Sequence, residues 1–396
     1  MTVGPRPRVW IPAVAAAALG ARALAVGLTP GYVPRHDDHS YVQHALALAD
    51  TAAYPRFSDH GHAVATAYRA PGFPMLLALV DRVLGPGLTS ERAVQVVVGA
   101  VLAVLVGIVA RELWGPRTAL AAAALAAVSP VLVLFGASLI SEPLFTALML
   151  GALACALHAR GRLPWAAAAG LLAAGAALTR PEGLAVAVGV ALCAGGRRAA
   201  AVALVATLVG VTPWTIRNAE ALHAFVPVST ETGNTLAGTY NAASLHDARW
   251  RDPRLSDLYP AARRAHRDDE AATDRALTHA ALRFAAAHPA YVLHVAGANA
   301  MRLAGAVPAS FARLSLRTVS LPVAPAGLLR GALLITTLLG LAGAGTAAAR
   351  RAPPGWWLAG AVVLLAALLV NAEQRFAVPL QPFLLALAPL PFTRGT

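Results

Sequence analysis

The feature that most constrains the fold is a repeated pattern of apolar runs, many of them close in length to the thickness of a membrane. The chain has 396 residues, of which 58% are hydrophobic and only 13% are charged. A soluble domain usually carries about 25% charged residues, and a helix needs about 20 apolar residues to cross the hydrocarbon core. The pattern therefore predicts an all-α polytopic membrane protein, with residues 1–396 forming a single membrane domain.

The basic residues support the same class. A formal net charge of +13 would suggest a nucleic-acid partner if the protein were soluble. Here all basic side chains other than histidine are arginines, and many stand in short loops between apolar runs, as the topology-determining residues of membrane proteins do. We therefore expect membrane lipids, and no nucleic acid, around this chain. Cys155 and Cys193 lie within apolar runs and predict neither a disulfide nor a metal site.

Alternation of arginine-rich and acidic loops predicts about ten membrane-spanning helices, with both termini in the cytoplasm of a bacterial cell and external juxtamembrane helices. The first span is expected to be retained and not cleaved as a signal peptide. The expected spans cover residues 9–28, 92–110, 120–135, 144–157, 165–178, 184–194, 200–211, 323–344, 356–370 and 376–390.

Two longer external segments separate these spans. Residues 29–91 form the first external loop, with a short helix near Asp38 and a re-entrant or interfacial helix over residues 75–84. Residues 215–322 form the large external loop, which holds many of the acidic residues and an expected amphipathic helix over residues 271–287.

Unusual charged motifs gather at the external ends of the spans, where the folded bundle would bring them to one cavity. They are Asp37 with Asp38, Arg69, Glu142, Arg180 with Glu182, Arg217, and Glu373 with Arg375. A carboxylate there can deprotonate an acceptor hydroxyl as it attacks a sugar. Arginine holds a departing phosphate well, because its guanidinium fork matches phosphate oxygens and stays charged near lipid.

The stretch His36-Asp37-Asp38-His39-Ser40-Tyr41 carries a family resemblance. It resembles the first-loop motif of the GT-C superfamily, whose members use polyprenyl-phosphate sugars. The branch it looks most like is family 39, which includes protein O-mannosyltransferases and the lipid A aminoarabinose transferase. The resemblance implies a GT-C-like helix bundle, a catalytic base at Asp37 and a second acid at Asp38.

Five further motifs extend the resemblance along the chain. Tyr68-Arg69 precedes a proline, Glu142 opens the acidic motif of a later helix, and Arg180 with Glu182 and then Arg217 follow at span ends. Glu373-Gln374-Arg375 resembles the last external turn of the family. The resemblance implies that these residues bind substrate, with Arg69 and Arg375 on the donor phosphate. It leaves open whether the acceptor is a glycan, a lipid or a protein.

Several plainer interpretations stay open beside these roles. One of the two aspartates can serve as a helix cap, Arg180 and Glu182 can simply pair with each other, and Arg217 can anchor a helix end at the headgroups. The histidines at positions 36, 39, 44, 60 and 62 match no tight metal-binding motif, so no bound metal is expected, although a loosely held divalent cation stays open.

The function predicted from the sequence is therefore transfer of a sugar from a polyprenyl-phosphate donor on the external face of the plasma membrane. Two other classes are weighed against it. A transporter or lipid-linked-sugar flippase would also have many spans, but it should carry its functional charges near the middle of the membrane. A non-catalytic envelope-assembly protein would not need the acidic pair to face a cavity.

Overall fold

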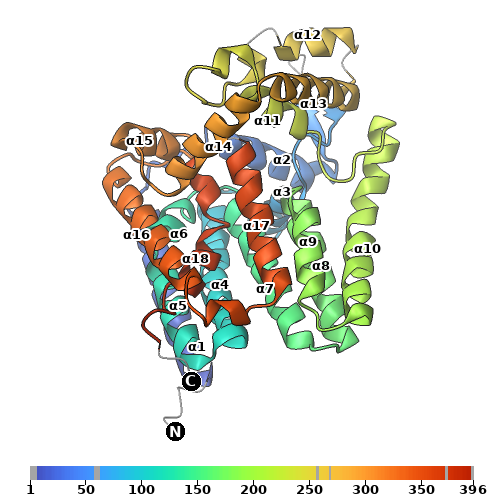
Figure 1. The fold of residues 1–396 in the computed structure, drawn as a ribbon. Coiled ribbons are helices and arrows are strands. Elements are labelled where there is room, and N and C mark those ends of the chain that lie inside the picture. The colour runs from blue at the N-terminus through green and yellow to red at the C-terminus, as the bar shows by residue number, and fades with distance from the viewer. Residues whose placement is uncertain (1–6, 58–62, 256–257, 267–268, 371–372, 394–396) are drawn as a thin grey trace.

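A computed structural model describes residues 7–57, 63–255, 258–266, 269–370 and 373–393. Almost all regular structure in these ranges is helical, apart from a short antiparallel hairpin of β1 (Pro55–Phe57) and β2 (Ala63–Ala65). Figure 1 shows two levels, a bundle of roughly parallel helices and a cap of helices over one end of it. The predicted all-helical membrane fold is confirmed.

The bundle contains a helix, or a pair of helices, for each predicted span. Its members are α1 (Pro7–Gly27), α4 (Leu88–Trp114), α5 (Pro116–Val128), α6 (Pro130–Phe135), α7 (Glu142–Ala159), α8 (Leu163–Thr179), α9 (Gly183–Leu192), α10 (Arg197–Leu222), α16 (Ala326–Ala344), α17 (Pro354–Leu369) and α18 (Gln381–Leu387). Within the described residues, five of these helices are long and apolar enough to cross a membrane, and four shorter ones are apolar. Small residues, mostly alanine, fill much of the core between them.

Three of the predicted spans differ clearly from the helices of the structure, and proline accounts for two of these differences. The expected span 120–135 is divided into α5 and α6 at Pro130. The expected span 376–390 is a 3₁₀ turn (Gln374–Ala377) followed by the seven-residue α18. In contrast, α10 runs through Pro213 to Leu222, about three turns beyond the expected end at residue 211. Those turns are held by Asn218, whose side chain donates to the carbonyls of Val226 and Val228.

Arg22 of α1 is completely buried against the break between α5 and α6. Pro130 has no N–H to give to the carbonyl of Ala126, four residues earlier. The Arg22 guanidinium supplies the missing donor, at 3.4 Å from the Ala126 carbonyl and 3.0 Å from that of Ala127. Gly99 of α4 makes the room, since a Cβ there would lie 2.3 Å from Arg22 Nε. A buried charge therefore caps a helix end inside the bundle.

Replacing Arg22 with Met should destabilise the protein by about 2 kcal/mol, because two buried carbonyls lose their charged donor. A lower melting temperature in detergent would show the effect. The control is Arg198→Met, which removes an exposed arginine at the start of α10. Equal melting temperatures for the two variants would contradict the capping role.

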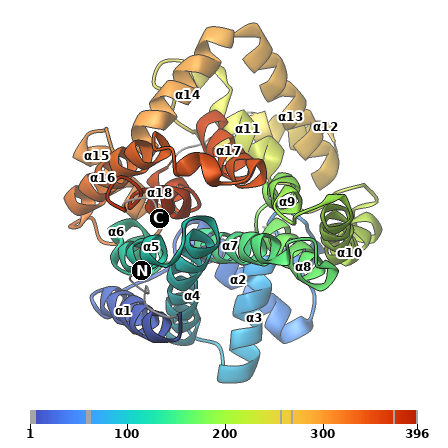
Figure 2. The same ribbon diagram turned by 60° about the horizontal axis from the view of Figure 1, so that its bottom comes forward.

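The segments outside the bundle form the first loop and the cap. The first loop contains α2 (Asp37–Thr51), the hairpin, and α3 (Gly72–Leu84), which includes the predicted interfacial helix. The cap contains α11 (Thr232–Thr239), α12 (Leu258–Ala265), α13 (Glu270–Ala287), α14 (Pro289–Leu303) and α15 (Ala309–Arg317). The expected amphipathic helix is α13. Figure 2 shows α13 and α14 meeting at an apex outside the bundle, with α11 and α17 between them and the other helices.

The cap has its own small core and is fastened to the bundle by hydrogen bonds. Tyr240, Leu277 and Tyr291 are buried in that core. The Tyr240 hydroxyl donates to the carbonyl of Leu369 at the end of α17, at 2.6 Å. Asn299 of α14 donates to the carbonyls of the residues on either side of Leu369. These bonds fix the cap over the end of α17.

A second set of hydrogen bonds joins the cap and α10 to the first loop. Glu270, the first residue of α13, accepts from Thr66 Oγ1 at 2.7 Å, from the Ala67 N–H at 2.9 Å and from Thr230 Oγ1 at 2.6 Å. Arg217 of α10 donates to the carbonyl of Thr66 at 2.6 Å and to that of Tyr54 at 2.9 Å. The chain that leads to Arg69 is therefore held from both sides.

Candidate active site

A cavity of about 840 Å³ lies between the cap and the bundle. Its polar walls come from the start of α2, the Tyr68-Arg69 stretch, the start of α7, the turn between α8 and α9, and the start of α11. Its apolar wall is formed by Val363, Ala366, Ala367 and Val370 of the α17 end, with Pro379 beyond it. The cavity therefore has a charged region and an apolar region.

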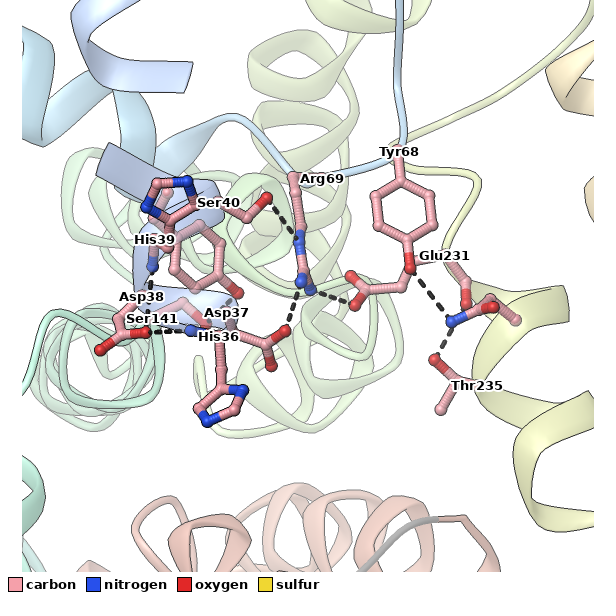
Figure 3. Close-up of polar contacts among 12 residues, drawn as sticks. His36, Asp37, Asp38, His39, Ser40, Tyr68, Arg69, Ser141, Glu231 and Thr235 are labelled. Carbon is pink, nitrogen blue, oxygen red and sulfur yellow. Dashed lines mark hydrogen bonds and ion pairs between the residues drawn. The ribbon is translucent and has the colours of Figure 1, made fainter. Parts of the chain in front are cut away.

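Asp37 stands on the wall of this cavity, in the first turn of α2. The positive end of the helix dipole favours a carboxylate there. One carboxylate oxygen pairs with the guanidinium of Arg69, and the other accepts from Arg375 Nη2 at 2.6 Å. The side chain keeps 30% of its surface exposed, so a substrate can still reach it. Figure 3 shows Asp37 pointing toward Arg69.

Opposing effects act on the proton affinity of Asp37. Burial alone would raise the pKa of its carboxyl, but the guanidinium groups of Arg69 and Arg375 outweigh burial and hold that pKa well below its usual range. Asp37 is therefore ionised at neutral pH. A carboxylate bound on both oxygens is a weak base, so one arginine has to change partner before Asp37 can accept a proton efficiently.

Asp38 occupies a different kind of position. It is fully buried, and one carboxylate oxygen accepts backbone N–H groups from Arg35, His36 and His39 at 2.9–3.1 Å. The other oxygen accepts the Tyr32 hydroxyl at 2.7 Å. Asp38 is not on the cavity wall, and these contacts shape the loop that presents Asp37. Its predicted catalytic role stays a prediction, while its position is that of a structural residue.

Arg69 links the first loop to the cap. Besides Asp37, its guanidinium pairs with Glu231, the residue before α11, and lies 5.2 Å from the centre of the Tyr41 ring. The neighbouring Tyr68 lines the cavity, and its hydroxyl accepts from Asn234 Nδ2 at 3.1 Å. Burial raises the pKa of the Glu231 carboxyl against the pull of Arg69. Figure 3 shows the row Asp37, Arg69, Glu231.

The opposite side of Asp37 is built by Arg375 and its partners. Arg375 Nε lies 3.1 Å from Glu373 and 3.8 Å from the buried carboxylate of Glu142. Glu142 also lies 3.1 Å from Arg180, which in turn pairs with Glu182 at 2.5 Å. These residues all line the cavity. Arg180 and Glu182 therefore pair with each other and also line the cavity.

The complete ion-pair network holds five carboxylates and three arginines among the described residues. Its members are Asp37, Arg69, Glu142, Arg180, Glu182, Glu231, Glu373 and Arg375. Each arginine contacts at least two carboxylates, so its charge is already compensated. An anionic ligand has to compete with these carboxylates for the guanidinium groups.

Arg217 is the predicted substrate-binding residue that the structure places elsewhere. It does not line the cavity, and its guanidinium lies over the Trp214 ring at 4.8 Å while donating to first-loop carbonyls. The anchoring interpretation fits this position, although the anchor is the first loop and not the lipid headgroups.

The donor set for a divalent cation is poor in the part of the chain that the structure describes. No group of three or more His, Cys, Asp and Glu side chains there is arranged to hold a metal ion. Both oxygens of Asp37 are taken by arginine. Of the histidines considered from the sequence, His36, His39 and His44 line the cavity, whereas His60 and His62 lie outside the described residues. The loosely held cation therefore stays a prediction that these residues do not support.

Sequence reasoning missed the cap residues of the site. Glu231, Asn234, Trp250, Asp252 and Arg254 all line the cavity. They come from the large external loop, residues 215–322, of which only Arg217 was predicted as a site residue. The polar stretch of residues 230–234, which leads into the first turn of α11, was the available signal, but its position in space depends on the hydrogen bonds of Glu270.

Comparison with known proteins agrees with this architecture. Residues 68–216 match the family model described as dolichyl-phosphate-mannose-protein mannosyltransferase. No curated protein sequence matches the chain. Oligosaccharyltransferase AglB from Archaeoglobus fulgidus, in complex with an inhibitory peptide and a dolichol-phosphate, is similar in fold: TM-score 0.56, 15% identity, 96% of this chain and 50% of that one.

Two further solved structures are similar. The apo form of the same Archaeoglobus fulgidus enzyme gives a TM-score of 0.56 at 16% identity, with 96% of this chain and 50% of that one covered. ArnT from Cupriavidus metallidurans bound to undecaprenyl phosphate gives 0.48 at 14% identity, with 96% and 77% covered. This chain spans about half the length of the oligosaccharyltransferase. The predicted GT-C resemblance is confirmed, and the chain has the fold of GT-C membrane glycosyltransferases.

Proposed function

We propose that this protein transfers a sugar from a polyprenyl-phosphate donor to an acceptor hydroxyl, on the external face of a bacterial plasma membrane, with Asp37 as the general base. The observation that carries the proposal is the place of Asp37: an accessible carboxylate between two arginines, on the wall of a cavity with one charged and one apolar side. An external site at this face puts both termini in the cytoplasm.

The proposed donor fits the two sides of the cavity. The apolar residues at the end of α17 suit the first isoprene units of a lipid, and the arginines suit its phosphate. The archaeal oligosaccharyltransferase of similar fold binds a dolichol-phosphate in its solved complex, which supports the same class of donor here.

The proposed reaction is a single displacement at the anomeric carbon. The acceptor oxygen attacks this carbon while its proton passes to Asp37, and the bond between the anomeric carbon and the phosphate oxygen breaks. The electron pair of that bond leaves with the phosphate, which gains negative charge. Arg375 and Arg69 stabilise this charge, which is greater in the transition state than in the donor. Attack from the side opposite the phosphate inverts the anomeric centre.

Partner exchange by the arginines connects donor binding to the base. In the ion-pair network Arg375 Nη2 donates to Asp37 at 2.6 Å. A phosphate that draws Arg375 away frees one oxygen of Asp37 and raises the basicity of that carboxylate. Asp37 then becomes an effective base only when the donor is bound.

The transporter or flippase alternative has weaker support. The charged network lies at one end of the bundle, next to the cap, whereas a transporter needs its binding charges near mid-membrane. The arginines buried within the bundle, Arg22 and Arg92, donate to backbone carbonyls and have structural partners. The assembly-protein alternative also has weaker support, because Asp37 does face a cavity.

Purified protein in lipid nanodiscs should consume one member of a panel of polyprenyl-phosphate sugars and release polyprenyl phosphate. Thin-layer or mass-spectrometric detection of the lipid product follows the reaction, with empty nanodiscs as the control. The acceptor mixture is a crude envelope extract, because the acceptor is unidentified. If donors bind and none is consumed, the transferase proposal fails in favour of a carrier.

A further inference from the structure

The cap contributes a group of cavity-lining residues that the proposed displacement does not use. Trp250, Asp252 and Arg254 come from the segment between α11 and α12, and Asn234 comes from α11. They adjoin the reacting centre through Tyr68, whose hydroxyl accepts from Asn234 and whose neighbour in the chain is Arg69. A molecule bound here would therefore reach toward Asp37.

The indole ring of Trp250 lies flat on the backbone of α11. A Cβ built at Gly238 would lie 2.1 Å from Nε1 and 2.6 Å from both Cδ1 and Cε2. Near-equal short distances to three consecutive ring atoms place that point above the ring and not at its edge. The Gly238 carbonyl also accepts the N–H of Arg251 at 2.9 Å, which fixes the chain beside the ring. One ring face therefore packs on α11, and the remainder of the side chain forms cavity wall.

Two sets of polar groups line the same cavity as the ring. Asn234 is 4% exposed, and its Oδ1 has no hydrogen-bond partner among the described residues. A buried carbonyl oxygen of this kind calls for a donor from a ligand or from water. Arg254 forms a bidentate ion pair with Asp252, with Nε at 2.9 Å from Oδ1 and Nη2 at 2.7 Å from Oδ2. The pair offers both donor N–H groups and acceptor oxygens to a ligand.

We propose that these residues form the acceptor subsite and that the acceptor is a neutral glycan. The inference rests on the proposed transferase function. The C–H face of a sugar ring meets the electron-rich face of an indole favourably. Sugar hydroxyls both donate and accept, which matches the acceptor Asn234 Oδ1 and the mixed donors and acceptors of the Asp252–Arg254 pair. A peptide acceptor would match one aromatic ring face together with these hydrogen-bonding groups less well.

Binding can be measured without any catalytic turnover. Saturation-transfer NMR uses the full chain in nanodiscs with a set of neutral hexasaccharides of mannose, glucose, galactose and arabinose, and with a Ser/Thr-rich peptide of similar length. Wild type is expected to bind at least one hexasaccharide, with the strongest transfer to ring C–H protons. Trp250→Ala should weaken that binding about tenfold, and Trp250→Phe should retain most of it.

Two further measurements distinguish failure of the glycan subsite from failure of the proposed transferase function. Undecaprenyl phosphate binding should be the same in wild type and Trp250→Ala, since the proposed phosphate contacts are Arg69 and Arg375 and not the indole ring. Gly238→Ala, which displaces the ring, should weaken hexasaccharide binding as Trp250→Ala does. Absence of hexasaccharide binding, equal binding by Trp250→Ala, or Trp250-dependent binding of the peptide instead would overturn the glycan subsite. Failure of undecaprenyl phosphate to bind wild type counts against the transferase function and leaves the hexasaccharide result readable.

Discussion

Replacing Asp37 with Asn should slow sugar transfer by about a thousandfold, because general-base catalysis of this kind contributes about 10² to 10⁴ in rate. Asn keeps the size of the side chain and removes its charge and its proton affinity. Initial rates of polyprenyl-phosphate release in nanodiscs measure the loss. The matched control is Asp50→Asn, which changes an exposed aspartate of the same helix, α2, and should leave the rate unchanged.

The pH dependence gives this prediction a second readout. The arginines hold the pKa of Asp37 well below its usual range despite burial, so the carboxylate is lost only as the pH falls through that low value. Between about pH 7 and pH 5 the kcat/KM of wild type, which reports the enzyme before donor binding, should therefore not fall through protonation of Asp37. Transfer that persists in well-folded Asp37→Asn protein would remove Asp37 from the mechanism.

Replacing Arg375 with Lys should lower kcat/KM for the donor by about a hundredfold, or roughly 2.7 kcal/mol. Arg375 is 8% exposed and contacts Asp37, Glu142 and Glu373 at the same time. An ammonium group keeps the charge, but it lacks the planar fork that can hold a phosphate while it still contacts a carboxylate.

The measurement is donor concentration dependence, with undecaprenyl phosphate binding measured separately. A lower kcat together with weaker lipid-phosphate binding is expected, because the growing charge on the leaving group loses its best partner. The control is Arg317→Lys, an exposed arginine at the end of α15, which should change neither quantity. Unaltered donor affinity and unaltered kcat in Arg375→Lys would show that the phosphate lies elsewhere.

The sequence was informative where the membrane limits the choices. Helices that cross a bilayer must begin and end at its two faces, so charges at their external ends were expected to meet. The structure brings Asp37, Arg69, Glu142, Arg180 and Arg375 to one cavity wall. The class of fold and the helices of the bundle followed from apolar runs and arginine loops for the same reason.

The sequence patterns did not predict which way the side chains point or which residues pair with each other. Asp37 and Asp38 are adjacent and chemically alike, yet one faces the cavity and the other is tied to three backbone N–H groups, because successive helix residues point about 100° apart. Glu231 joins the network from more than 160 residues away from Arg69, through a cap whose position depends on Glu270. Such contacts arise from tertiary packing and leave no periodic trace in the chain.

The excess of carboxylates around the cavity has a consequence for turnover. The described wall carries six carboxylates and five arginines: Asp37, Glu142, Glu182, Glu231, Asp252 and Glu373 face Arg35, Arg69, Arg180, Arg254 and Arg375. A phosphodiester donor brings one negative charge, whereas the lipid phosphate left after transfer carries close to two at neutral pH. The arginines therefore hold the spent lipid more tightly than the donor, but each arginine that the phosphate releases has a carboxylate of the wall beside it, so re-pairing within the wall offsets the lost contact and helps to empty the site for the next cycle.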